Sequence, residues 1–188
     1  MRDIEGVEEI VASLAPHLGD IEKEFHVINN RFLNLIGSDH DTLGRVLRSH
    51  LVIEHFLNDF LELHYRIDNI GAIRLSFYQK ACMLPSVGSA AAFAKPGILE
   101  VNSIRNKYAH NIGYDLNQAS MEAVNEVLRL SRPEVDFDTR VDQIEAFTAT
   151  ACAFLSAPLS GLREVYEHAF KNIRVRENED AASESGNQ

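Results

Sequence analysis

Three side chains that can act on a phosphate group lie within one six-residue stretch, Arg105-Asn106-Lys107-Tyr108-Ala109-His110. An imidazole can accept or donate a proton near neutral pH, so His110 is a candidate general acid or base. The guanidinium of Arg105 is always charged and can stabilise negative charge that develops on a phosphate. Asn106 can orient either group through its amide. These residue types suit acid–base chemistry on a phosphodiester that needs no metal.

The six residues fall on the last turns of a helix that the sequence predicts over residues 97–111. At about 100° per residue, one face carries apolar side chains and is assigned to the core: Val101, Ile104 and Tyr108. A second face carries a polar ridge at four-residue spacing: Asn102, Asn106 and His110. Arg105 lies between the two faces, where it can bury its stem and present its guanidinium.

The surrounding sequence predicts an all-α fold, a single up-and-down bundle of about six to seven helices. Alternating strand patterns and Asn-Gly hairpin signals are absent from the sequence. A long helix opens at Ser38-Asp39-His40-Asp41 and runs to about Tyr65. Its apolar side chains form a wide stripe that should face the core: Leu43, Val46, Leu47, Ile53, Phe56, Leu57, Phe60 and Leu61. Pro96 is expected in the first turn of the 97–111 helix. The other predicted helices cover residues 4–15, 20–36, 72–83, 90–94, 117–132 and 139–175, the last bent or split at Pro158 and Gly161. Pro16 is expected to end the first of them, and a capping box at Thr139 and Asp142 to start the last.

Length and composition suit one globular domain, predicted over residues 1–176 and followed by a disordered acidic tail at 177–188. The net charge of −10 excludes a broad surface for non-specific binding of nucleic acid, but leaves room for a small basic site. Only Cys82 and Cys152 are present, and the acidic start lacks the apolar stretch of a secretory signal. We therefore expect a cytoplasmic protein without membrane association.

The hexapeptide resembles the Arg-x4-His motif of the HEPN superfamily, small helical bundles of toxin–antitoxin, antiviral and CRISPR systems. The succession of residues 47–57, 75–80 and 104–110 is similar to the mannitol-operon repressor-like branch of that superfamily, over about residues 40–115. The resemblance implies a metal-independent endoribonuclease without cofactor, acting on RNA as a homodimer in which both motifs face one cleft. It makes Arg105, Asn106 and His110 catalytic and Lys107 supporting, and it implies an antitoxin or regulatory protein as partner. Ile112 occupies the position where minimal toxins of this type often carry a tyrosine.

Glu54 lies on the apolar stripe of the long helix, in line with His50, and a buried carboxylate needs a partner. We predict that Glu54 pairs with Arg105 and fixes the direction of its guanidinium. The alternatives are a local pair with Arg48 or a partly solvated position at the rim. The histidines of this helix, His50, His55 and His64, lack the spacing of a metal-ligand pair, so we expect them at the surface or at an interface.

Three functions remain open from the sequence. The first is a ribonuclease that uses Arg105, Asn106 and His110. The second is a non-catalytic regulator that resembles the mannitol repressor and acts through protein contacts, because no DNA-reading helix is visible. The third is a dimeric scaffold in which the polar ridge only builds an interface. Geometry separates them: catalytic side chains should be accessible, whereas structural ones should be buried and bound to partners within the chain.

Overall fold

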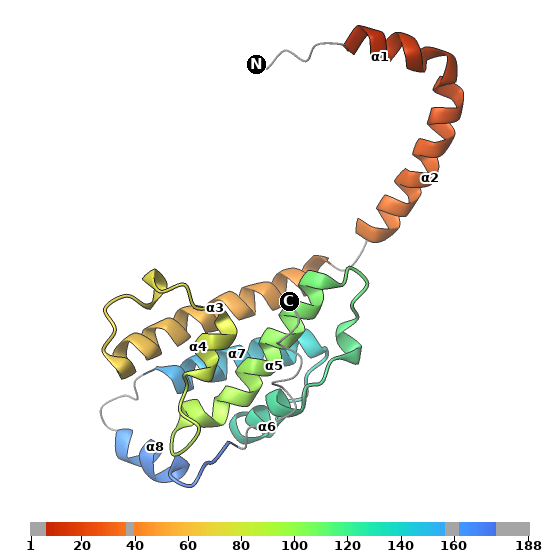
Figure 1. Cartoon of the computed structure of the whole chain (residues 1–188). Coiled ribbons are helices and arrows are strands. Elements are labelled where there is room, and N and C mark those ends of the chain that lie inside the picture. The colour runs from red at the N-terminus through yellow and green to blue at the C-terminus, as the bar shows by residue number, and fades with distance from the viewer. Residues whose placement is uncertain (1–6, 37–39, 157–161, 176–188) are drawn as a thin grey trace. The chain divides into compact units, whose positions relative to one another are not determined.

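The computed structural model describes residues 7–36, 40–156 and 162–175, and its fold is all-α, as predicted (Figure 1). The chain divides into two compact units, residues 1–40 and 41–188. The single domain predicted over residues 1–176 is thus revised to two units. Most large apolar side chains of the first unit are exposed, whereas those of the second form a buried core. The predicted acidic tail, 177–188, lies outside the described residues.

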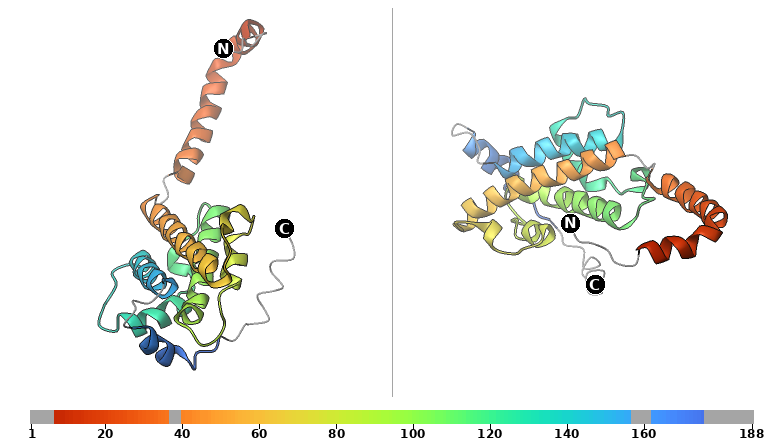
Figure 2. Two further views of the ribbon diagram at one scale, coloured as in Figure 1. Left: turned by 90° about the vertical axis from the view of Figure 1, so that its left-hand side faces the viewer. Right: turned by 90° about the horizontal axis from the view of Figure 1, so that it is seen from above.

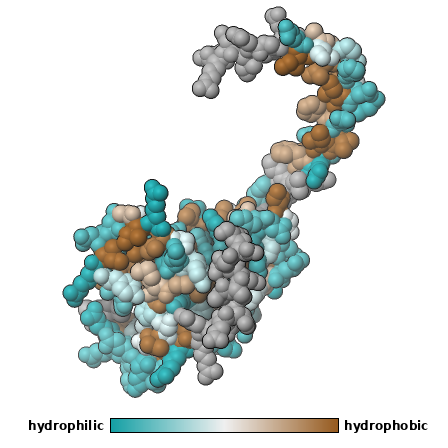
Figure 3. All heavy atoms as spheres, in the orientation of Figure 1, coloured by the Kyte–Doolittle hydropathy of each residue, from teal (hydrophilic) through white to brown (hydrophobic). Residues whose placement is uncertain are grey.

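The first unit consists of two helices that meet at Pro16. They are α1 (Val7–Leu14) and α2 (Leu18–Ile36), and the 3-10 turn η1 (Ala15–His17) joins them. Proline lacks an N–H and its ring crowds the preceding turn, so the backbone tightens here and does not continue as one α-helix. Solvent-exposed apolar side chains lie along α2 (Figure 3). They include Leu18, Phe25, Ile28 and Phe32.

The second unit begins with α3 (His40–Tyr65), which supplies much of its core. Its buried side chains recur at helical spacing: Val46, Ser49, His50, Ile53, Leu57 and Leu61. The other predicted members of the stripe are half-buried: Leu43, Leu47, Phe56 and Phe60. The stripe predicted for this helix is therefore confirmed, and it places His50 inside the protein.

A short helix, α4 (Phe77–Cys82), follows the 3-10 turn η2 (Ile70–Ala72). A capping box fixes its start: the Gln79 amide donates to Ser76 Oγ at 3.2 Å, and the Ser76 amide donates to Gln79 Oε1 at 2.8 Å. This cap explains why the helix begins five residues later than the predicted 72–83. α4 brings Phe77 and Lys80 into the buried part of the unit.

The motif lies on α5 (Ala90–His110), which starts at the Ser89 cap and passes through Pro96 without ending. The two helices predicted over 90–94 and 97–111 are therefore one. Burial on both sides of the proline holds the helix together, since Ala92, Ala94, Ile98 and Val101 are all fully buried. The residue after the proline, Gly97, lets α5 lie directly against the ring of Phe147 on α7.

Gly97→Ala is expected to lower the free energy of unfolding by up to about 2 kcal/mol. An added Cβ would lie 2.5 Å from Cε2 and 2.6 Å from Cζ of Phe147, a ring that is fully buried. Overpacking of this kind costs about 1–3 kcal/mol, more than the ~1 kcal/mol that alanine gains over glycine in a helix. Gly44→Ala on α3 is the matched control, because nothing lies within 4 Å of its added Cβ. Urea denaturation of both variants should show opposite signs, and a gain for both would contradict the close approach.

The remaining helices complete the bundle: α6 (Glu122–Ser131), α7 (Arg140–Leu155) and α8 (Arg163–Phe170). The 3-10 turn η3 (Leu116–Gln118) replaces the predicted helix start at Asn117, because Asp115 caps the turn by accepting from the Asn117 amide. The capping box predicted at Thr139 and Asp142 is confirmed. Pro158 and Gly161, predicted to split the last helix, lie outside the described residues.

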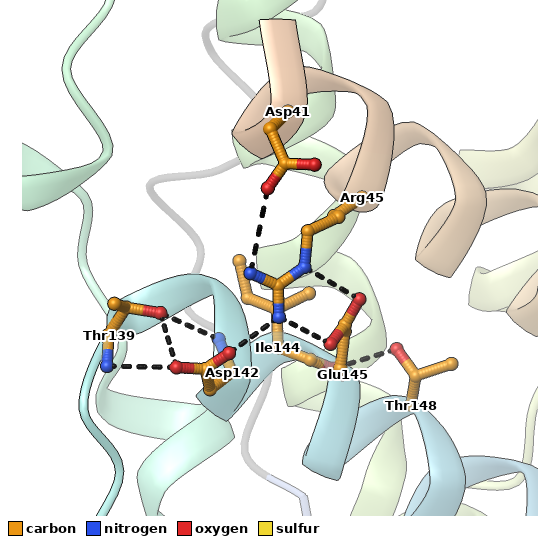
Figure 4. A network of polar contacts seen from close by, with 7 residues as sticks. All are labelled: Asp41, Arg45, Thr139, Asp142, Ile144, Glu145 and Thr148. Atoms are coloured by element: carbon orange, nitrogen blue, oxygen red, sulfur yellow. Dashed lines mark hydrogen bonds and ion pairs between the residues drawn. The ribbon is translucent and has the colours of Figure 1, made fainter. Parts of the chain in front are cut away.

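An ion-pair network joins the starts of α3 and α7 (Figure 4). Arg45 Nη2 lies 2.5 Å from Asp142 Oδ1 and 2.6 Å from Glu145 Oε2, and Arg45 Nε donates to Glu145 Oε1 at 3.0 Å. Hydrogen bonds from Thr139 and from Arg45 lower the pKa of the Asp142 carboxyl. The C-terminal ends of α3 and α7 line one pocket, so the two helices run in the same direction (Figure 2). α5 packs against α7. The last turns of α5 carry the motif, residues 105–110.

Candidate active site

A buried polar cluster lies just before the motif and ties α5 to α3. Asn102 Oδ1 lies 3.1 Å from His50 Nε2, and both side chains are buried. The imidazole of His50 also stacks on the Phe77 ring, with 4.0 Å between centroids and 30° between planes. The sequence predicted Asn102 on an open ridge and His50 at a surface or interface. The structure instead uses both as an internal link that fixes the rotation of α5.

The environment of His50 favours its neutral form. Burial lowers its pKa; the hydrogen bond to Asn102 opposes that shift, and the nearby Arg105 charge adds to it. The carboxylate of Glu54 acts weakly in the opposite direction. In the neutral tautomer protonated at Nε2, His50 donates its hydrogen bond to the Asn102 amide oxygen. His50 is therefore a structural group, unsuited to exchanging protons with a substrate.

Protein stability should fall on acidification because of His50. The unfolded chain binds a proton to this imidazole near its ordinary pKa of about 6.5, while the folded chain resists protonation. The contribution of neutral His50 to the free energy of unfolding is complete above the pKa of the unfolded chain. It is lost as the pH falls toward the lowered pKa of the folded state. Each tenfold difference in proton affinity between the two states contributes about 1.4 kcal/mol. Urea denaturation between about pH 7 and pH 5 should show a shallower loss of stability in His50→Gln. The control is His55→Gln at an exposed position of the same helix, and equal slopes in both variants would contradict the assignment.

Arg105 is half-buried. Its Nη1 donates to Asn106 Oδ1 at 3.1 Å, which places the Asn106 amide against the guanidinium. Its Nε is buried and has no hydrogen-bond partner among the described residues. Such a donor is costly to leave unpaired in the interior. The Nη1–Asn106 hydrogen bond lies at the surface, so the accessible end of the guanidinium is the end that Asn106 holds.

His110 is exposed at the last position of α5, and the helix ends at Asn111, whose amide donates to Lys107 O at 2.9 Å. Within the described ranges, His110 makes no hydrogen bond or ion pair. The next segment folds back on the helix: the rings of Tyr108 and Tyr114 meet edge to face with centroids 4.9 Å apart. Lys107 Nζ lies 5.9 Å from the centroid of the Tyr114 ring. His110 therefore stands free at the end of a well-anchored helix.

Glu54 does not pair with Arg105, so that prediction is wrong. Its Oε1 accepts a hydrogen bond from Lys80 Nζ at 2.8 Å, in an ion pair whose side chains are 28% and 7% exposed, respectively. The alternative of a local pair with Arg48 is wrong as well. No pattern in the sequence pointed to Lys80, because its burial depends on the capped start of α4.

The polar ridge is therefore divided between two roles. Asn102 belongs to the interior, while Asn106 and His110 are exposed beside the half-buried Arg105. No group of three or more His, Cys, Asp or Glu residues that could hold a metal ion occurs in the described part of the chain. A pocket of about 430 Å³ lies elsewhere, between the ends of α3 and α7, the start of α5 and α8, and contains no motif residue.

Comparison with known proteins gives no match: no family model, curated protein or solved structure is significantly similar to this chain. The HEPN resemblance therefore rests on the hexapeptide, on its place at the end of a helix and on the order of the preceding segments. None of the helices in the described ranges combines the length and hydropathy that crossing a bilayer requires.

Proposed function

We propose that the protein is a metal-independent endoribonuclease of the HEPN type, acting in a toxin–antitoxin or defence system. The observation that carries the proposal is the accessibility of the motif: His110 is exposed, and the hydrogen bond between Arg105 Nη1 and Asn106 lies at the surface. A purely structural cluster would bind both side chains within the chain. The His50–Asn102 pair is such a cluster, and it lies one turn earlier on the same helix.

In the proposed reaction His110 takes the proton of a ribose 2′-hydroxyl, which attacks the adjacent phosphorus and displaces the 5′-oxygen of the next nucleotide. Arg105 stabilises the charge that develops on the phosphorane, and Asn106 holds the guanidinium in place. The products are a 2′,3′-cyclic phosphate and a free 5′-hydroxyl, and the leaving oxygen also needs a proton.

That second proton transfer calls for a second copy of the chain. His50 is buried and hydrogen-bonded to Asn102, so it cannot serve as the acid, and the hexapeptide holds a single histidine. In a homodimer with both motifs in one cleft, one His110 would act as base and the other as acid. This need supports the homodimer that the resemblance implies.

A second candidate is a non-catalytic regulator resembling the mannitol-operon repressor. The net charge of −10 favours it, because an acidic protein attracts RNA poorly at long range. Such a regulator would act through protein contacts with a DNA-binding or phosphotransfer partner, and the exposed end of α5 would then be a contact surface.

Incubation of the pure protein with a mixed RNA pool in excess EDTA tests the first proposal. We expect cleavage that leaves 2′,3′-cyclic phosphate ends and that added magnesium does not accelerate. If no RNA pool is cut, and if a variant lacking both Arg105 and His110 affects growth as the unaltered protein does, the ribonuclease proposal fails and the regulator is favoured.

A further inference from the structure

Five apolar side chains of α2 follow a heptad spacing, while two other exposed apolar side chains of this helix, Val27 and Leu33, lie outside that row. Leu18, Ile21, Phe25, Ile28 and Phe32 are separated by three, four, three and four residues, and the sequence carries the same spacing on to Leu35. With Leu18 at position a, these residues alternate between positions a and d without interruption, and we call this row from Leu18 to Leu35 the seam. An apolar repeat that keeps to positions a and d over consecutive heptads is typical of a coiled coil.

Four of these five side chains are exposed: Leu18 is 56% exposed, Phe25 67%, Ile28 62% and Phe32 53%. Ile21 is half-buried. The polar side of α2 carries more acids than bases: Asp20, Glu22 and Glu24 against Lys23 and Arg31. Lys23 pairs with Asp20 at 2.9 Å. Helices that lie on anionic membranes carry Lys and Arg there instead. The occupant that fits this seam is another heptad helix.

We propose that α2 forms an antiparallel two-helix coiled coil with α2 of a second copy of this chain. Side-chain size supports this orientation: Phe25 would face Ile28 of the other copy and Ile21 would face Phe32, so each phenylalanine meets a smaller residue. The same register places Leu18 opposite Leu35. A parallel pair would stack Phe25 on Phe25. Parallel dimers also prefer β-branched residues at a, whereas here isoleucine stands at d and phenylalanine at a.

The flanking charges support the same pairing. Glu24 and Arg31 both occupy position g, and the two g positions face each other across an antiparallel pair. Each Glu24 would therefore lie beside Arg31 of the other copy, giving two complementary pairs. A parallel pair would place Glu24 opposite Asn29 and would leave Arg31 opposite Ile36. The proposal does not depend on ribonuclease activity, because the seam and its charges lie in the first unit.

Sedimentation velocity of the full chain over a wide range of concentration tests the dimer. The seam is short, so we expect a reversible dimer whose fraction rises with concentration. Ile28→Asp should raise the dissociation constant by about 100-fold or more, since each dimer would bury two aspartates. Val27→Asp is the matched control: Val27 is 70% exposed at position c, outside the seam, and this variant should dimerise as the unaltered chain does. A monomer at all concentrations, or equal losses in both variants, overturns the proposal.

Charge exchange and cross-linking test the orientation. Glu24→Arg and Arg31→Glu should each weaken self-association by about three- to tenfold, and mixing the two variants should restore it. In a Cys82→Ser background, which removes the exposed native thiol, Ile21→Cys mixed with Phe32→Cys should form an intermolecular disulfide. Ready disulfide formation by Ile21→Cys alone indicates parallel helices and overturns the antiparallel assignment. Far-UV circular dichroism checks that each variant keeps its helices.

Discussion

Replacing Arg105 and His110 together with alanine is expected to reduce RNA cleavage by about 10³-fold or more while the fold persists. Loss of a general acid–base group typically costs about 10²- to 10⁴-fold, and loss of one charge-stabilising donor about 10²- to 10³-fold. Both residues serve one transition state, so the double variant should fall short of the product of the single effects. The measurement is the single-turnover cleavage rate of a labelled RNA.

The controls separate chemistry from folding. Ser103→Ala changes an exposed position of α5 outside the hexapeptide and should cleave RNA as the unaltered protein does. Arg105→Lys keeps the charge but loses the planar fork, so it should recover only part of the rate. The melting temperatures of the two single alanine variants should stay close to that of the unaltered protein, because His110 is exposed and Arg105 half-buried. Cleavage by the double variant at the unaltered rate would trace the activity to a contaminant.

The sequence predicted the helices well where a local signal marked them. Pro16, the apolar stripe of α3 and the Thr139–Asp142 capping box each act within a few residues, so their outcome can be read from spacing alone. Pro96 misled the prediction because the stabilising contacts of α5 come from distant residues. A proline inside a helix removes one hydrogen bond, yet burial on both sides and the contact of Gly97 with Phe147 keep the helix continuous.

The site was predictable at the level of one helix and not beyond it. Helical spacing placed Asn106, His110 and Arg105 relative to one another, because those relations are local. The partners of His50 and Glu54 come from α5 and α4, so they depend on how three helices pack. Nothing in the spacing of α3 shows that His50 meets Asn102 or that Lys80 reaches Glu54 at 2.8 Å.

Glu54→Gln is expected to lower the free energy of unfolding by about 2–3 kcal/mol, because it leaves the ammonium of Lys80 without its counter-charge. The Lys80 side chain is 7% exposed, so water cannot replace the carboxylate. Partial exposure of Glu54 keeps the loss below that of a completely buried pair. Chemical denaturation of the variant and of the unaltered chain measures the difference.

Removing both charges should recover much of that loss. The double variant Glu54→Leu, Lys80→Met replaces the pair with apolar side chains of similar length, and such replacements are often neutral. The double-mutant cycle should then give a coupling energy of about 1–3 kcal/mol between the two positions. Cleavage per folded molecule should change by less than about twofold in Glu54→Gln, because this carboxylate holds Lys80 and not Arg105. Unchanged stability of Glu54→Gln combined with slow cleavage would contradict that conclusion and would favour a pairing of Glu54 with Arg105.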